Sequence, residues 1–224
     1  MMQQTASALS RGCGALLLLF ALLPAAPRAA NAQDAAAFVQ NMAAQASQVL
    51  GPQVPETVRQ ARFRQLIDED FDLSGAARFV LGPQVNAMSP QQQQEFMRLF
   101  RDNIAQSYSH KLAQFGGAPL RVTGSRPMGN ETIVTSQITR TNGAPAELDW
   151  HVINRDGHFL ITDVTVDGVS QKLAERGEFA GIIQRNGGRP ESVIAALRQQ
   201  LEPTPHVGYG SSSPPHQAAP GSGR

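Results

Sequence analysis

Hydrophobic residues recur at helical spacing through the first half of the chain. The clearest helix begins at Ser89, an N-cap residue, with Pro90 at the first helical position and Gln92 completing a capping box. Its apolar stripe continues to Phe115, where two glycines end it. The spacing predicts four helices in this half: residues 34–50, a segment that opens at Pro55, residues 72–81 and residues 90–115.

From residue 120 onward the pattern changes to the two-residue alternation of strands. Asn-Gly at 142–143 and Asp-Gly at 156–157 are typical of the tight turns that join antiparallel strands. In the third of these segments, alternation places Leu148, Trp150 and Val152 on one face. Strands are expected at residues 120–126, 132–140, 146–155 and 158–167.

Helical spacing returns after Gly168, first over residues 173–183 and then, beyond Pro190, over residues 193–201. Because helices and strands are segregated along the chain, the pattern predicts an α+β fold. We expect a four-stranded antiparallel sheet packed against a cluster of helices.

The two ends of the chain differ in composition from the middle. Residues 1–32 contain Arg11, an apolar run at 14–23 and a small-x-small pattern at 30–32, which together indicate a secretory signal that is cut after residue 32. The alternative is a membrane anchor, but the apolar run is shorter than the roughly 20 residues that cross a bilayer. Residues 203–224 are rich in Pro, Gly and Ser and are expected to be disordered. The chain therefore divides into a signal peptide (1–32), a folded domain (33–202) and a tail (203–224), and the protein is expected in the periplasm.

The charge of the chain argues against a nucleic-acid partner. The chain carries 19 Lys and Arg against 18 Asp and Glu, a net charge of +1, whereas binding to nucleic acid needs a basic surface. Removal of residues 1–32 takes away two arginines and no acid, which leaves −1. The same cut removes Cys13, the only cysteine, so thiolate chemistry is excluded, as is an internal disulfide.

Candidate catalytic residues are few. Ser170 with His151 or His158 and Asp163 is the best arrangement for a nucleophilic hydrolase, although no nucleophile-elbow motif surrounds Ser170. The acidic run at residues 68–72 could hold Ca²⁺, but its spacing differs from that of an EF-hand loop and suits a solvated turn that caps the next helix. No metal or cofactor is therefore expected, and a hydrolase is the less favoured interpretation.

The predicted helices and sheet present many apolar faces for a domain of about 170 residues. In one interpretation these faces fill one another and form an ordinary core. In the other, a gap between the sheet and the helices is lined by the same residues and forms a hydrophobic ligand cavity. Spacing alone does not decide between the two.

Three groups of residues follow one another in order over residues 34–202. They are Phe63-Arg64-x-Leu66 with Phe71-Asp72 and Arg78-Phe79-Val80-Leu81-Gly82; Ser89-Pro90 with Gln94, Phe96, Phe100 and Tyr108; and Asp163-Val164-x-Val166-x-Gly168-Val169-Ser170 with Arg176, Phe179 and Ile182-Ile183. Together these groups resemble the MlaC, or toluene-tolerance auxiliary, family of periplasmic lipid-binding proteins. The chain departs from the family after Gly82, where the family often has an aromatic-basic pair and this chain has PQVNAM at residues 83–88.

The resemblance implies a deep apolar cavity that holds the acyl chains of a phospholipid and needs no catalytic residue. It implies a soluble carrier, expected to be monomeric, that works between an outer-membrane lipoprotein complex and an inner-membrane ABC transporter with MCE domains. A hopanoid or other polycyclic lipid is an alternative ligand, and weak headgroup selectivity is expected because the headgroup stays in water at the cavity mouth. The residues expected to line the cavity are Phe79, Phe96, Phe100, Ile104, Tyr108, Trp150, Val152, Leu160 and Val164.

Overall fold

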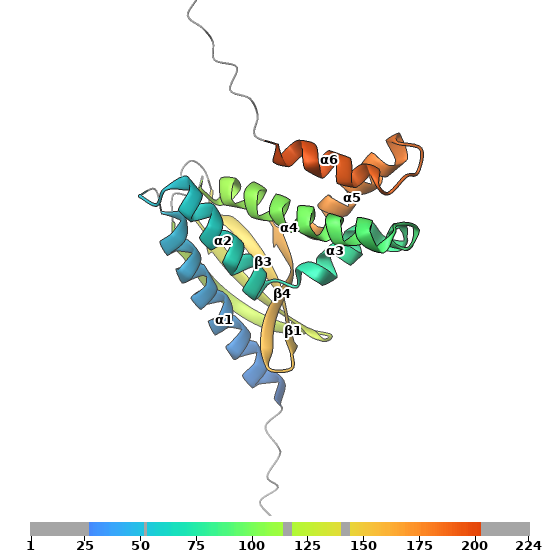
Figure 1. Ribbon diagram of the computed structural model, residues 1–224. Helices are drawn as coiled ribbons and strands as arrows, with labels where there is room; N and C mark the ends of the chain where they lie inside the picture. Colours follow the sequence, from blue (N-terminus) through green and yellow to red (C-terminus); the bar gives the residue numbers. More distant parts are fainter. Residues whose placement is uncertain (1–26, 52, 114–117, 140–143, 203–224) are drawn as a thin grey trace, which may run out of the picture.

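The computed structural model describes residues 27–51, 53–113, 118–139 and 144–202 (Figure 1). The helices of this part of the chain are α1 (Pro27–Leu50), α2 (Glu56–Asp70), α3 (Leu73–Leu81), α4 (Pro90–Ala113), α5 (Gln171–Arg185) and α6 (Ser192–Leu201), with a 3-10 helix, η1 (Gly82–Ala87), after α3. The strands are β1 (Leu120–Met128), β2 (Glu131–Ile138), β3 (Ala146–Arg155), β4 (His158–Val166) and β5 (Val169–Ser170).

The strands form one antiparallel sheet in the order β1-β2-β3-β4-β5, so each strand pairs with its neighbour in sequence. The predicted α+β fold is confirmed, with one strand more than the four expected. The extra strand, β5, folds back on β4 through Asp167 and Gly168, which have positive φ angles of 47° and 83°. The β3–β4 turn is built in the same way by Asp156 and Gly157, as the Asp-Gly sequence predicts.

A β-bulge in β4 changes which side chains face the helices. The pairing of β4 with β3 skips Thr162, which is therefore an extra residue in the strand. Beyond this residue the alternation of side chains is shifted by one position. Ile161 and Val164 consequently lie on the face that carries Trp150, whereas Leu160 lies on the opposite face.

Capping side chains fix where the helices begin. The Ser89 Oγ accepts the backbone N–H of Gln92, and the Gln92 Oε1 accepts the N–H of Ser89, so the predicted capping box forms at the start of α4. Asp72 is the N-cap of α3, and its Oδ1 accepts the N–H of Gly75 at 3.0 Å. The acidic run that ends at Asp72 thus caps the next helix, as expected for a helix end.

The first helix starts earlier than predicted. α1 begins at Pro27 rather than at residue 34, so the predicted cleavage after Ala32 falls within this helix. Residues 1–26 and 203–224, which include most of the predicted signal peptide and the whole predicted tail, lie outside the described residues, as does the predicted Asn-Gly turn at 142–143.

Helices cover one face of the sheet and continue past its end (Figure 1). α1 packs on β1 and β2, and α2 packs between α1 and α4. α6 packs on α4, and α3 packs on α5. α6 therefore rests on α4, whereas α3 and α5 also contact the edge of the sheet at β4.

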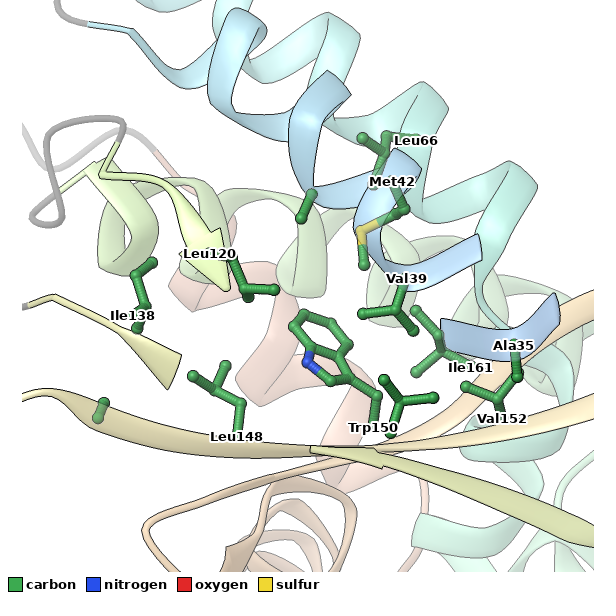
Figure 2. Close-up of a cluster of buried hydrophobic side chains, with 13 residues drawn as sticks. Ala35, Val39, Met42, Leu66, Leu120, Ile138, Leu148, Trp150, Val152 and Ile161 are labelled. Atoms are coloured by element: carbon green, nitrogen blue, oxygen red, sulfur yellow. The ribbon is translucent and has the colours of Figure 1, made fainter. Parts of the chain in front are cut away.

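The apolar core is divided into three clusters. The first lies between α1 and the sheet, where Trp150 is surrounded by Leu148 on the sheet and by Val39 and Met42 of α1 (Figure 2). The second joins α3, α4, α5 and α6. The third is smaller, joins α2, α3 and α4, and contains Phe63. Three clusters in place of one indicate that the helices do not close completely on the sheet.

An aromatic trio holds the second cluster together. The rings of Phe96 and Phe100 on α4 are stacked with centroids 5.6 Å apart, and both meet Phe179 of α5 edge to face, at 5.8 and 6.2 Å. Such aromatic pairs add stabilisation beyond the area they bury. The trio fixes α5 to the middle of α4.

One buried polar group lies inside the first cluster. The indole N–H of Trp150 donates to the Ser136 Oγ at 2.8 Å, and the same hydroxyl reaches the Leu148 carbonyl oxygen at 3.4 Å. Ser136 is fully buried on β2, so this pairing satisfies groups that would otherwise be costly to bury. The bond also fixes the orientation of the indole on the inner face of the sheet.

The corner between α2 and α3 is tied to β4. The N–H of Asp72 donates to the Ile161 carbonyl oxygen at 2.9 Å, and Phe71 forms a bridge with the same residue. The Asp72 carboxylate pairs with the Arg155 guanidinium at 2.7 Å. This hydrogen bond from Arg155 lowers the pKa of Asp72 below its usual value. One side chain thus caps α3 and links it to the β3–β4 hairpin.

Replacement of Asp72 is expected to destabilise the fold. Asp72→Ala removes an N-cap and an ion pair, and should lower the free energy of unfolding by about 1–2 kcal/mol in urea denaturation. Arg155→Gln removes only the ion pair, whose Arg side chain is half exposed, and should lower the free energy of unfolding by less than Asp72→Ala does.

The charge-dependent part of this stabilisation is expected above pH 4 and should disappear below it. The pKa of Asp72 is lowered in the folded state, so protonation at lower pH removes the advantage of the native protein over Asp72→Asn. Equal stability of the native protein and both Asp72 variants at pH 7 would contradict this role.

Candidate functional site

A cavity of about 330 Å³ lies where the three clusters would otherwise meet. Its volume falls within the range of small-molecule binding pockets, roughly 300–1,000 Å³. The inner face of the sheet forms one wall, and α1, α2, α3 and α4 form the others. The second interpretation of the apolar pattern, a gap between sheet and helices, therefore describes this fold.

The wall of the cavity is almost entirely apolar. The sheet contributes Leu148 and Trp150 from β3 and Ile161 from β4, which face the helices because of strand alternation and the bulge at Thr162. The helices contribute one apolar stripe each. The apolar helical residues that line the cavity are Met42, Ala43 and Ala46 of α1; Phe63, Leu66 and Ile67 of α2; Leu73, Ala76 and Val80 of α3; and Phe100 and Ile104 of α4.

Five of the nine residues expected from the sequence lie at this cavity: Phe100, Ile104, Tyr108, Trp150 and Val164. They come from α4, β3 and β4, and the fold brings them together as neighbours around one space. That they contact a ligand stays a prediction.

The other four expected residues lie elsewhere. Phe96 and Val152 are 1% and 2% exposed and pack in the second and first clusters. Phe79 packs on the outside of the second cluster, with the Lys172 Nζ 4.8 Å and the Arg176 Cζ 4.9 Å from its ring centroid. Leu160 lies on the opposite face of the sheet because of the bulge.

The sequence-based selection missed the contribution of the first two helices. Met42 and Ala46 of α1, and Phe63 and Leu66 of α2, line the cavity. Their helical spacing was visible in the sequence, and it identified the apolar face of each helix. The spacing does not tell how far that apolar face lies from the sheet.

The apolar wall ends at a group of polar side chains, Tyr108, Asp163, Gln171, Lys172 and Glu175, which we call the polar rim. Tyr108 comes from α4, Asp163 from β4 and the other three from the first turns of α5. The Tyr108 Oη donates to the Gln171 Oε1 at 3.4 Å, which links α4 to α5 across the rim. Gln171, Lys172 and Glu175 are partly exposed, so the cavity reaches solvent at this end.

Acidic groups surround the Tyr108 hydroxyl. Burial, together with the negative charges of Glu175, Asp163 and Glu178, raises the pKa of Tyr108 to about 12. The phenol therefore stays protonated and acts as a hydrogen-bond donor at any physiological pH. The same shift reports a negative electrostatic potential at the rim.

Asp163 organises the start of α5. Its Oδ1 accepts the backbone N–H groups of Val164 and Lys172 at 2.8 and 3.0 Å, and its Oδ2 accepts the hydroxyl of Ser170. Ser170 in turn is the N-cap of α5 and accepts the N–H of Leu173 at 3.1 Å. These bonds fix the position of the first turn of α5 against the cavity.

The fold does not assemble the candidate hydrolase triad. A catalytic His would have to lie between Ser170 and Asp163, yet these two residues bond each other directly. His151 instead pairs through Nδ1 with the Glu131 carboxylate at 3.0 Å. His158 is exposed at the β3–β4 turn. Ser170 and Asp163 are accounted for as the cap of α5.

Glu131 anchors the bulge from the outer face of the sheet. Its carboxylate accepts hydrogen bonds from His151 and from the Thr162 hydroxyl, the latter at 2.9 Å. Burial alone would raise the pKa of Glu131, but these hydrogen bonds and the charges of His151 and Lys172 lower it. The bulge is thus held by an ionised carboxylate behind the cavity wall.

A second hollow on the surface is of a different kind. It lies along α2, α4 and α6, and most of its lining is polar or charged. Arg64 and Arg98 both pair with Asp102, and Arg198 pairs with Glu95 nearby. These ion pairs link the three helices, so the hollow is explained by helix packing.

The part of the chain that the structure describes has neither a cluster of metal ligands nor a helix suited to a bilayer. Nowhere in the described ranges do three His, Cys, Asp or Glu side chains gather as a metal site would need. None of the helices in this part of the chain combines the length and hydropathy that a bilayer span requires.

Two known proteins are similar to part of this chain. The toluene tolerance protein ttg2D of Pseudomonas putida is 26% identical over 107 residues, which are 47% of this chain and 50% of that protein. The intermembrane phospholipid transport system binding protein MlaC of Haemophilus influenzae is 23% identical over 133 residues, 57% of this chain and 61% of that protein. The matches thus span about half to three-fifths of these relatives.

A solved structure has the same fold. The phospholipid-binding protein of Ralstonia solanacearum, determined in complex with a phospholipid, superposes with a TM-score of 0.60. The match covers 75% of this chain and 96% of that one, at 20% sequence identity. The family model for the MlaC protein matches residues 36–199, from the first helix to the last. The chain therefore belongs to the MlaC family.

Proposed function

We propose that this protein is a non-enzymatic lipid carrier that encloses the acyl chains of a phospholipid in the cavity between its sheet and helices. The cavity carries this proposal, because its wall is apolar and its one polar end reaches solvent, which matches the two parts of a phospholipid. The Ralstonia protein with a bound phospholipid supports the same assignment.

The physical need for such a carrier is large. A diacyl phospholipid has about 30 CH₂ groups, and exposing them to water costs on the order of 20 kcal/mol at about 0.8 kcal/mol each. Transit of a free lipid through water is therefore very slow. A closed apolar cavity removes most of this cost without any chemical step, so no catalytic residue is needed.

The proposed setting is the periplasm, with the predicted signal peptide as the route of export. There the protein would receive lipid from, or deliver it to, an outer-membrane complex and an inner-membrane ABC transporter that carries MCE domains. The name of the Haemophilus relative, an intermembrane phospholipid transport system binding protein, supports this setting. The carrier is proposed to act as a monomer, and the described lining of the cavity comes from a single chain.

The occupied protein is expected to be much more stable than the empty one. An empty apolar cavity of about 330 Å³ should cost on the order of 8 kcal/mol, at about 24 cal/mol per Å³. Protein purified without detergent should contain about one lipid per chain by solvent extraction and mass spectrometry. Removing the lipid should lower the melting temperature by at least about 10 °C, and adding phospholipid should restore it. Ligand-free protein with an unchanged melting temperature would contradict the proposal. A polycyclic lipid in the extract would replace phospholipid as the proposed ligand.

Filling the cavity should block binding without unfolding the protein. Ile104 lines the cavity, so Ile104→Trp should lower the lipid content per folded chain to less than half. Val152 is buried in the first cluster and does not line the cavity, so Val152→Trp is the matched control. It should overpack the core and cost about 1–3 kcal/mol of stability, while the folded fraction keeps its lipid. Equal lipid content in Ile104→Trp and in the native protein would count against the cavity as the binding site.

Trp150 gives a direct optical test of where the acyl chains lie. It is the only tryptophan of the chain and lines the cavity, so phospholipid with brominated acyl chains should quench more than half of its fluorescence. The control is Trp150→Phe combined with Val58→Trp, which moves the indole to an exposed position on the outside of α2. Little quenching is expected there. Similar quenching in both proteins would show that the lipid binds outside the cavity.

A further inference from the structure

One hydrogen bond joins two elements at the open end of the cavity. The Tyr108 Oη of α4 donates to the Gln171 Oε1 of α5 at 3.4 Å, and both residues line the cavity. Both are also partly exposed, so the bond lies where the cavity meets solvent rather than in its interior. A lipid that passes through this end moves between the two helices that the bond joins.

The acceptor side of this bond is held in a fixed orientation. The Gln171 Nε2 donates to the Val169 carbonyl oxygen of β5 at 3.0 Å, so both ends of the amide are engaged. Ser170, directly before Gln171, caps α5, and the Asp163 carboxylate accepts the N–H of Lys172, directly after it. The first turn of α5 therefore presents the amide oxygen to α4 from a position tied to the sheet.

The donor side keeps its proton. Burial and the negative charges of Glu175, Asp163 and Glu178 raise the pKa of Tyr108 to about 12. A neutral phenol donates a hydrogen bond, whereas an ionised one only accepts. The bond from Tyr108 to Gln171 is thus available at every physiological pH.

The aromatic trio joins the same two helices at a second place. Tyr108 follows Phe100 by eight residues on α4, and Gln171 precedes Phe179 by eight residues on α5. At 1.5 Å per residue, the hydrogen bond and the trio are about 12 Å apart along both helices. Ile104, midway between them on α4, lines the cavity. The hydrogen bond therefore ties together the end of α4 and the start of α5, beyond the reach of the trio.

We propose that the hydrogen bond from Tyr108 to Gln171 is a latch that slows the passage of lipid through the open end of the cavity. This inference rests on the proposed function and adds how the same cavity retains its ligand. Acyl chains that leave the cavity here have to separate α4 from the start of α5, which breaks the bond. Because the bond can form in the empty and in the occupied protein, it raises the barrier to exchange without changing the affinity.

Exchange kinetics test the latch. The purified protein is loaded with deuterated phosphatidylcholine and mixed with an excess of unlabelled phosphatidylcholine vesicles. At set times the protein is separated by gel filtration, and its labelled lipid is counted by mass spectrometry. Tyr108→Phe keeps the ring but removes the hydroxyl, and should lose labelled lipid about fivefold faster than the native protein, the scale expected for one neutral hydrogen bond. Its total lipid content should stay at about one per chain.

A second variant tests whether the hydroxyl acts through Gln171. Gln171→Leu removes the same bond from the other side and should speed the loss of lipid to a similar extent. The double variant Tyr108→Phe/Gln171→Leu should be no faster than the faster single variant, because the bond is lost only once. The matched control is Ser107→Ala, which removes a neighbouring hydroxyl of α4 that bonds Asn103 and does not line the cavity. It should exchange lipid at the native rate.

The outcomes separate the latch from the proposed function. A native exchange rate in Tyr108→Phe overturns the latch and leaves the carrier intact, as do additive effects in the double variant, which would show that Tyr108 acts through another group. A lower lipid content in Tyr108→Phe also overturns the latch, since Tyr108 would then be a binding contact. Native protein that takes up no phospholipid overturns the latch and the carrier together.

Discussion

The inner face of the sheet and the helices that cover it are held at a distance, and the rest of the molecule depends on that separation. α1 is fixed to the sheet by the first cluster, and the α2–α3 corner is fixed to β4 by the backbone bond from Asp72 to Ile161. The aromatic trio anchors α5 to α4. Each anchor lies at the edge of the cavity, so none of the side chains that the structure describes fills its middle. Leaving an apolar space of this size unfilled is expensive in a single domain, whose total stability is only about 5–15 kcal/mol.

The segment from β4 to the first turn of α5 connects the apolar wall to the polar end. The bulge at Thr162 turns Ile161 and Val164 toward the cavity on its two sides, and Glu131 holds the bulge from the outer face. Directly after it, Asp163 fixes the first turn of α5 through backbone N–H groups. The same few residues therefore decide which apolar side chains line the wall and where Lys172 and Glu175 emerge. A hydrogen-bonded network gives this end of the cavity a rigidity that apolar packing alone does not supply.

Local signals in the sequence predicted most of the elements but not their spacing in three dimensions. The capping box at Ser89, the Asp-Gly turn at residue 156 and the alternation around Trp150 all act between neighbours in the chain, and all appear as predicted. Leu160 and Val164 are four residues apart and would share a face of a regular strand, but the bulge, which leaves no regular mark in a sequence, puts them on opposite faces. Phe96 and Ile104 follow the same helical stripe, yet one is buried in a cluster and the other lines the cavity. A residue covered by a ligand and one covered by another side chain have the same hydrophobic pattern.

A carrier must release its ligand as well as hold it, and the divided core suggests how the two are balanced. A lipid that leaves the cavity for a membrane exchanges one apolar environment for another, so the hydrophobic effect contributes little to the difference. What differs is the empty protein, which loses the contacts that the acyl chains made with its three clusters. Because the anchors lie at the edges of the cavity, the sheet and helices can lose these contacts without losing their fold. The free-energy cost of the empty cavity opposes release of the lipid. For the carrier proposed above, transfer would then proceed when a partner lowers that cost, and the partner rather than the affinity of the cavity would set the direction of transport.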